Sequence, residues 1–248
     1  MIFHLDHIGV TVPSLEEARR ALDRVHPCFH TQSGIGPFEC FTEVSLHGPQ
    51  TLCISLHRRQ GGMDIELIEY PRVSTNGVSA LPWEFDPDAP MAGVAQVTRE
   101  ALERPVREGS SEWFVALLER CGTLNAVLVP VLDPIAEQTF WEGLRFEAVH
   151  ADPDLIVLRL RSPLPASGDR YVLLRKVDYT PRWFTDLEGV SEIALLCSSC
   201  STSLNALPAA TFRTSVSRLT IAGKSVDIAY ARSPAGVLVE LFSVRPVS

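Results

Sequence analysis

Apolar and polar residues alternate near the start of the chain. The alternation over residues 5–12 predicts a short strand with Ile8, Val10 and Val12 on one face. His7 lies on the opposite face, away from the apolar side chains that would pack into a core. We therefore expect this strand to present one histidine to a site.

The residues that follow predict one helix and three more strands. Ser14 is a suitable N-cap, Glu17 completes a capping box, and an apolar stripe continues the helix over residues 15–25. Apolar runs separated by Gly-containing and Pro-containing turns then predict strands over residues 38–46, 51–56 and 64–70. The first unit is therefore expected to have the order βαβββ.

The same order recurs twice along the chain. A strand, a helix and further strands are predicted again after residue 123, and once more after residue 181. The stretch between the first two units is rich in Pro, Gly and Asp before a predicted helix, and we interpret it as a linker, with a degenerate unit as the alternative. The expected divisions are residues 1–75, 76–122, 123–180 and 181–248.

An alignment of the three units shows that they differ in the residues at two equivalent strand positions. Aligning the first strands places His7 over Ala126 in the middle unit and over Glu192 in the last. Aligning the last strands gives the corresponding set Glu66, Val172 and Glu240. The first and last units therefore carry side chains able to bind a metal, and the middle unit does not. Carboxylates among apolar residues need a counter-charge, which a divalent cation would supply.

Composition and charge exclude several function classes. Hydrophobic residues make up 46% of the chain and charged residues 21%, which is ordinary for a globular protein with a sizeable core. The net charge of −8, without a Lys/Arg cluster, argues against nucleic-acid and anionic-membrane partners. No apolar run reaches the roughly 20 residues of a membrane span, and no signal peptide is evident, so we expect a cytoplasmic protein.

Six cysteines are scattered along the chain, and we favour a buried structural role over a disulfide framework. Cys197 and Cys200 have the spacing of half a zinc site or of a redox pair, but no second pair accompanies them. We therefore favour the structural interpretation for these two as well.

Several short sequence motifs resemble those of a known superfamily. They are Leu-Asp-His-Ile-Gly-Val at 5–10, Ile-Glu-Leu-Ile-Glu at 65–69, Phe-Trp-Glu-Gly-Leu-Arg-Phe at 140–146 and Leu-Val-Glu-Leu-Phe at 238–242. Together with the βαβββ order, they resemble the vicinal oxygen chelate superfamily of glyoxalases, bleomycin-resistance proteins and ring-cleaving dioxygenases. The first unit is most similar to the methylmalonyl-CoA epimerase-like branch.

The resemblance implies an α+β fold in which paired βαβββ units form curled mixed sheets, or cups. It also implies one divalent metal ion held by His7, Glu66 and Glu240, with Glu192 at a fourth ligand position where the family usually has histidine or a similar neutral ligand. An oxygen-rich set of this kind suits Mn²⁺, Fe²⁺, Co²⁺, Ni²⁺ or Mg²⁺, with Zn²⁺ also compatible. Whether the first and last units pair within one chain or across a homodimer is left open.

The implied activity is a metal-dependent isomerase, epimerase or lyase acting on a small carbonyl-containing molecule. A base removes a proton, and the metal stabilises the resulting enolate or oxyanion. Glu192 is the candidate base, and Glu240 is the second choice. The alternatives are a metal-free protein that binds a drug or natural product and, ranked lower because only one histidine is available, a ring-cleaving dioxygenase.

Overall fold

The computed structural model describes residues 1–22, 27–57, 63–74, 126–163, 168–178, 183–186 and 189–245. Its strands form one nine-stranded sheet and one four-stranded sheet, and neither closes into a barrel. Few helices accompany these sheets in the part of the chain that the structure describes, and its elements repeat the order strand, helix, strands. The predicted α+β fold with repeated βαβββ units is confirmed.

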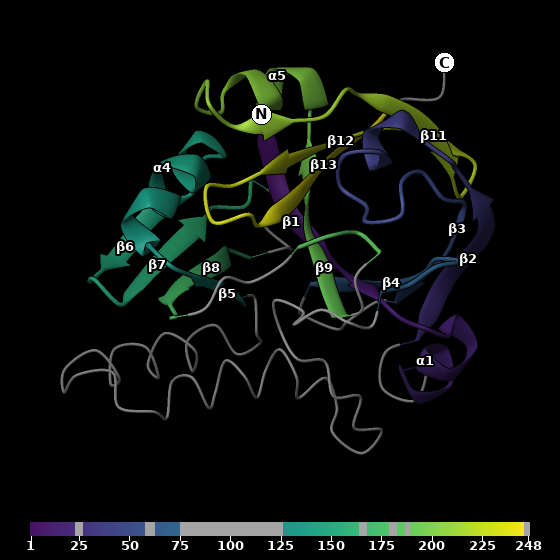
Figure 1. Ribbon diagram of the computed structural model, residues 1–248. Helices are drawn as coiled ribbons and strands as arrows, with labels where there is room; N and C mark the ends of the chain where they lie inside the picture. Colours follow the sequence, from purple (N-terminus) through teal and green to yellow (C-terminus); the bar gives the residue numbers. More distant parts are fainter. Residues whose placement is uncertain are drawn as a thin grey trace.

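The larger sheet combines strands from the two ends of the chain. Its order is β10-β12-β13-β9-β1-β4-β3-β2, with β11 paired to β12. In Figure 1 the purple and blue strands of the first unit and the green and yellow strands of the last unit belong to this one sheet, with β1 beside β9. The strands are β1 (Ile2–Thr11), β2 (Cys28–Ile35), β3 (Leu52–His57), β4 (Asp64–Glu69), β9 (Gly189–Cys197), β10 (Phe212–Arg213), β11 (Ser217–Ile221), β12 (Lys224–Arg232) and β13 (Leu238–Val244).

The junction between the two units is the antiparallel pairing of β1 with β9. On either side of this junction, β1 pairs in parallel with β4, and β9 pairs in parallel with β13. The four strands on which the candidate ligands were predicted are therefore neighbours in one sheet. The first and last units pair within a single chain, which answers the question that the sequence left open.

One predicted strand is wrong. Residues 38–46 form a turn that includes the short 3₁₀ helix η1 (Glu39–Phe41), and the strand of this unit is β2. Most residues of β2 are exposed or half-buried, so it lacks the apolar alternation that reveals a strand. The apolar residues Phe38, Phe41 and Val44 pack against the core. Their spacing of three residues is typical of a 3₁₀ turn, not of a strand.

Within the described residues, three α-helices accompany the sheets. Helix α1 (Leu15–Leu22) begins after Ser14, whose side chain accepts a hydrogen bond from Glu17 N at 3.3 Å. Helix α4 (Pro134–Gly143) is capped by Asp133, and α5 (Cys200–Asn205) by Ser199. The predicted continuation of α1 over residues 23–25 lies outside the described residues.

The smaller sheet belongs to the middle unit, drawn in teal in Figure 1. Its parallel register pairs Ala126 with Tyr171, so Leu173 occupies the position that corresponds to Glu66, rather than Val172 as the alignment predicted. Both residues are buried and apolar, and this position offers no ligand in either case. The sheet has the order β5-β8-β7-β6, with β5 (Ala126–Val131), β6 (Glu147–Ala151), β7 (Leu155–Leu160) and β8 (Arg170–Lys176). The predicted linker 76–122 lies outside the described residues, and the domain divisions stay predictions.

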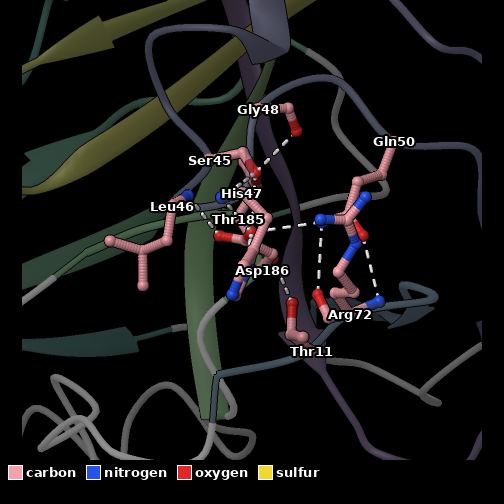
Figure 2. Close-up of polar contacts among 9 residues, drawn as sticks. All are labelled: Thr11, Ser45, Leu46, His47, Gly48, Gln50, Arg72, Thr185 and Asp186. Carbon is pink, nitrogen blue, oxygen red and sulfur yellow. Dashed lines mark hydrogen bonds and ion pairs between the residues drawn. The ribbon is translucent and has the colours of Figure 1, made fainter.

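A buried aspartate fastens the turn after η1 to the last unit (Figure 2). Asp186 is fully buried and accepts hydrogen bonds from the main-chain N–H groups of Leu46 (2.7 Å) and His47 (2.9 Å). The side chains of Ser45 (2.7 Å) and Gln50 (3.2 Å) donate to the same carboxylate. Because a buried carboxylate needs several donors, this network fixes the position of the turn that connects η1 to β3.

Within the described ranges, no helix is long and apolar enough to cross a lipid bilayer.

Candidate metal and catalytic site

Three predicted ligands meet on one face of the larger sheet. One ligand atom from each of His7, Glu66 and Glu240 lies within 4.8 Å of the other two, and all three residues are buried. The register explains the meeting, because His7 on β1 and Glu240 on β13 both lie opposite Ala194 of the intervening strand β9. Ligands of one ion at roughly 2.1 Å lie about 3 to 4 Å apart, so the three side chains fit a single cation.

A second carboxylate orients His7. Asp6 Oδ2 lies 3.0 Å from His7 Nδ1, so this nitrogen can donate a hydrogen bond and leave Nε2 as the potential metal ligand. Nε2 is 3.2 Å from Glu66 Oε2 but has no partner with hydrogen-bond geometry within the described residues. A buried imidazole nitrogen without a hydrogen bond, backed by a carboxylate on the other side, is typical of a metal-binding histidine.

Sequence reasoning missed Asp6 because neighbouring residues of a regular strand point to opposite faces. The β1–β9 pairing is irregular at this point: Leu5 lies opposite Leu195 and His7 opposite Ala194, which leaves Asp6 as an extra residue. Such a bulge redirects a side chain, and here the Asp6 carboxylate reaches the neighbouring His7 ring. The adjacent Asp-His pair was a visible signal, but the bulge was not.

The pKa of His7 reflects two opposing effects. Burial alone would lower the pKa, but the carboxylates of Asp6 and Glu66 outweigh it and raise the pKa well above its ordinary value. In the absence of a cation the imidazole therefore holds a proton.

Glu192 lies beside the group of three without being part of it. It is 1% exposed and lines the same cavity as Glu66 and Glu240, and its Oε2 atom has no hydrogen-bond partner among the described residues. Burial raises its pKa well above the ordinary value, and the charges of Glu240 and Glu66 raise it further. Burial also raises the pKa of Glu240, to about 7, even though His7 opposes the shift.

A glycine makes room for the Glu192 side chain. Gly9 lies directly opposite Glu192 in the β1–β9 pairing, and a Cβ atom at Gly9 would be 2.5 Å from Glu192 Cγ. No ordinary side-chain contact is that short, so any larger residue would displace the glutamate. In the sequence, Gly9 is only one residue of an alternating strand. Its role depends on Glu192, which lies 183 positions further along the chain.

The face that carries the carboxylates opens into a small cavity of about 40 Å³. This volume holds about three water molecules, so a larger ligand requires wall residues such as Phe41 to move. Phe41 is 4% exposed and contacts the Tyr230 ring at 5.7 Å between centroids. The apolar part of the wall consists of Ile35, Phe38, Phe41, Leu52, Ile54, Ile68, Leu219, Ile221 and Ile228, with Tyr70 and Tyr230.

The close approach of Gly9 and Glu192 yields a stability prediction. Gly9→Ala should lower the free energy of unfolding of the metal-free protein by about 1–3 kcal/mol, because the new methyl group overlaps the glutamate. Urea unfolding measures the change. Gly9→Ala combined with Glu192→Ala removes the overlapping atoms, so the double variant should recover most of the loss. Strictly additive effects of the two substitutions would contradict the contact.

The raised carboxyl pKa values predict how stability changes with pH. A glutamate whose folded pKa lies above its ordinary value stabilises the fold at low pH, and this contribution is lost as pH rises through the folded pKa. For Glu240 the window runs from its ordinary 4.5 to about 7, and Glu192 shifts in the same direction. Each such group changes stability by about 1.4 kcal/mol per pH unit within its window.

Metal-free protein should therefore become less stable between pH 5 and pH 7 in urea unfolding experiments. Replacing both Glu192 and Glu240 by glutamine should flatten this decline, because the glutamine amides do not titrate. An equally steep decline in the double variant would show that other groups cause it.

Comparisons with known proteins agree with this architecture. No protein-family model matches the chain, and no curated protein matches its sequence. Among solved structures, a glyoxalase I mutant from Zea mays superposes with a TM-score of 0.55 at 12% identity, over 97% of this chain and 92% of that one.

Two further matches cover only about half of this chain. An integron cassette protein from V. Cholerae is 18% identical and covers 49% of this chain and 94% of its own, with a TM-score of 0.36. A virulence protein from Salmonella typhimurium is 19% identical and covers 49% of this chain and 95% of its own, also with a TM-score of 0.36. The full-length superposition on glyoxalase I, together with the paired βαβββ units, shows that the chain has the glyoxalase fold.

Proposed function

We propose that the protein is a divalent-metal-dependent enzyme of the vicinal oxygen chelate superfamily, acting on a small carbonyl-containing molecule as an isomerase, epimerase or lyase. One observation carries the proposal: two buried glutamates meet a single histidine that Asp6 orients, and a third buried glutamate, Glu192, lines the same cavity. Removing this much negative charge from water is costly unless a cation compensates it. The glyoxalase fold supports the same conclusion.

His7, Glu66 and Glu240 are the proposed ligands. One imidazole and two carboxylates suit Mn²⁺, Fe²⁺, Co²⁺, Ni²⁺, Mg²⁺ or Zn²⁺. Asp6 acts on the metal indirectly, because it holds the His7 ring with Nε2 directed away from the Asp6 carboxylate. Glu192 is adjacent, and its Oε2 atom has no hydrogen-bond partner among the described residues, so it could approach either the ion or a substrate.

A bound ion would act as a Lewis acid that stabilises negative charge developing on the substrate oxygens. The protein must supply a base, and Glu192 is our candidate, with Glu240 as the second choice. A raised pKa makes a carboxylate a stronger base, and a bound cation beside it would favour its ionised, proton-accepting form. Glu192 would take the proton from the carbon next to the carbonyl group, hold it, and return it to that carbon or to its neighbour. The apolar wall of the cavity would limit the access of water to this exchange.

The alternatives differ in their use of metal. A metal-free binding protein would have no reason to gather buried glutamates around one histidine. A ring-cleaving dioxygenase would be expected to present two histidines and one carboxylate, whereas this group contains one histidine. Cytoplasmic location, a homodimer and the epimerase-like branch stay predictions.

Metal binding is the first test. Metal-free protein titrated with Mn²⁺, Ni²⁺ or Zn²⁺ should take up one ion per chain. Asp6→Asn should weaken binding by about 10- to 100-fold, because the ring of His7 loses its orienting carboxylate. His7→Ala and Glu240→Gln should weaken it further, because each removes a ligand. Calorimetry and metal analysis of the dialysed protein measure these effects.

Glu17→Gln is the matched control, since Glu17 is an exposed glutamate on α1 and its replacement should leave the affinity unchanged. A wild-type protein that takes up no divalent ion from any of these titrations would overturn the metalloenzyme proposal and favour the binding protein.

Proton abstraction is the second test. The metal-loaded protein should catalyse exchange of carbon-bound protons with D₂O in at least one member of a panel of α-hydroxy ketones, α-keto acids and 1,3-dicarbonyl compounds, as followed by NMR. Glu192→Gln should retain the metal and lower the exchange rate by about 10²- to 10⁴-fold, because the amide cannot accept the proton.

Undiminished exchange by Glu192→Gln with full metal content would rule out Glu192 as the base. The corresponding Glu240→Gln measurement would then decide whether the second choice holds, after correction for its metal content.

A further inference from the structure

Two cysteine side chains lie near each other and do not line the cavity that contains Glu66, Glu192 and Glu240. Cys197 is the last residue of β9, and Cys200 is the first residue of α5. Their Sγ atoms are 3.9 Å apart, and each cysteine is 2% exposed. A disulfide bond is about 2 Å long, so rotation of the two side chains through a short distance would join the sulfurs.

We propose that Cys197 and Cys200 form a reversible dithiol–disulfide couple, a modification site that is independent of the proposed metal centre. The two cysteines do not have equal roles. Cys197 is the nucleophile and Cys200 is the thiol that closes the bond. This division follows from the groups that surround each sulfur.

The surroundings of Cys197 favour its thiolate. The interaction with the Cys200 side chain is the largest effect and lowers the pKa of Cys197 to about 7, although burial opposes the shift. The Ser203 hydroxyl and the Ser199 main-chain N–H contribute in the same direction. Ser199 also caps α5 by accepting a hydrogen bond from Thr202 N at 3.3 Å, which fixes the turn between the two cysteines.

The surroundings of Cys200 favour its protonated form. Its Sγ lies 3.2 Å from the carbonyl oxygens of both Asp227 and Leu241, to which the thiol can donate. The pKa of Cys200 is raised, first by its interaction with Cys197 and then by burial. Oxidation would remove the donor that these carbonyl oxygens share. The reduced form is therefore stabilised, and we expect a disulfide that a thiol reductant reopens.

A zinc half-site is the competing interpretation. Among the described residues, the only group of three or more potential ligands is His7, Glu66 and Glu240, so neither cysteine has a third ligand nearby. Two sulfurs alone do not complete the four-coordinate environment of structural zinc. The geometry therefore favours redox chemistry over metal binding.

The reaction requires a small disulfide as the oxidant. The Cys197 thiolate attacks one sulfur of the oxidant, which forms a mixed disulfide and releases one thiolate. Cys200 then loses its proton and attacks Cys197 Sγ, which releases the second thiolate and closes the Cys197–Cys200 bond. The protein loses two electrons and two protons, and the oxidant is reduced to two thiols. Both cysteines are buried, so the turn must open locally for the first step.

Incubation of the folded, full-length protein with glutathione disulfide tests the couple. After alkylation and proteolysis, mass spectrometry should find Cys197 and Cys200 protected from alkylation and joined, with the joined peptide lighter by two hydrogen atoms. Dithiothreitol should restore both thiols. Cys200→Ser should stop at a mixed disulfide on Cys197, and Cys197→Ser should leave Cys200 reduced.

Cys53→Ser is the control, because Cys53 is a half-buried free cysteine on β3 and its loss should not affect the reaction. The experiment is repeated in urea just below the unfolding transition, so that slow opening cannot conceal reactivity. If Cys197 and Cys200 both remain alkylatable under the two conditions, or if Cys197 bonds to another cysteine, the proposal is wrong.

Discussion

The antiparallel pairing of β1 with β9 joins the two ends of the chain and brings the candidate ligands together. Each strand contributes one ligand-type residue, and each pairs in parallel on its other side with a strand that contributes a second. The pairing is irregular at Asp6 and again between Gly9 and Val10. These irregularities determine which side chains reach the face of the sheet, so the geometry of the site depends on this one junction.

The junction also gathers several acidic side chains in a buried region. Glu66, Glu192 and Glu240 are each less than a tenth exposed, and His7 supplies the only positive charge of the four-residue set. Burying an ion without a partner costs several kcal/mol, and neighbouring carboxylates add repulsion. The raised pKa values of Glu192 and Glu240 are the consequence in the metal-free protein. The fold thus keeps its carboxylates where a cation is the simplest compensation.

The role of His7, Glu66 and Glu240 as metal ligands stays a prediction, but the structure brings the three side chains together. The residue pattern singled them out because they occupy repeated strand positions that are apolar in the middle unit, and the superfamily resemblance implied their role. It could not predict Asp6, whose direction depends on a bulge, or Gly9, whose importance depends on a distant glutamate. It also placed a strand over residues 38–46, where apolar side chains pack inward from a 3₁₀ turn instead. Local periodicity identifies faces of regular elements, whereas irregularities and partners are set by tertiary pairing.

The middle unit has no ligand at the matching positions, yet it supports the strand that carries Glu240. Glu137 on α4 is fully buried and accepts a hydrogen bond from Ser233 Oγ at 3.0 Å and another from Ala235 N. These residues form the turn that leads into β13, and Ser233 Oγ in turn accepts from Val237 N at 3.1 Å. A buried carboxylate of the middle unit therefore fixes the start of a ligand-bearing strand. This role explains why a unit without metal chemistry would still be needed for the proposed site.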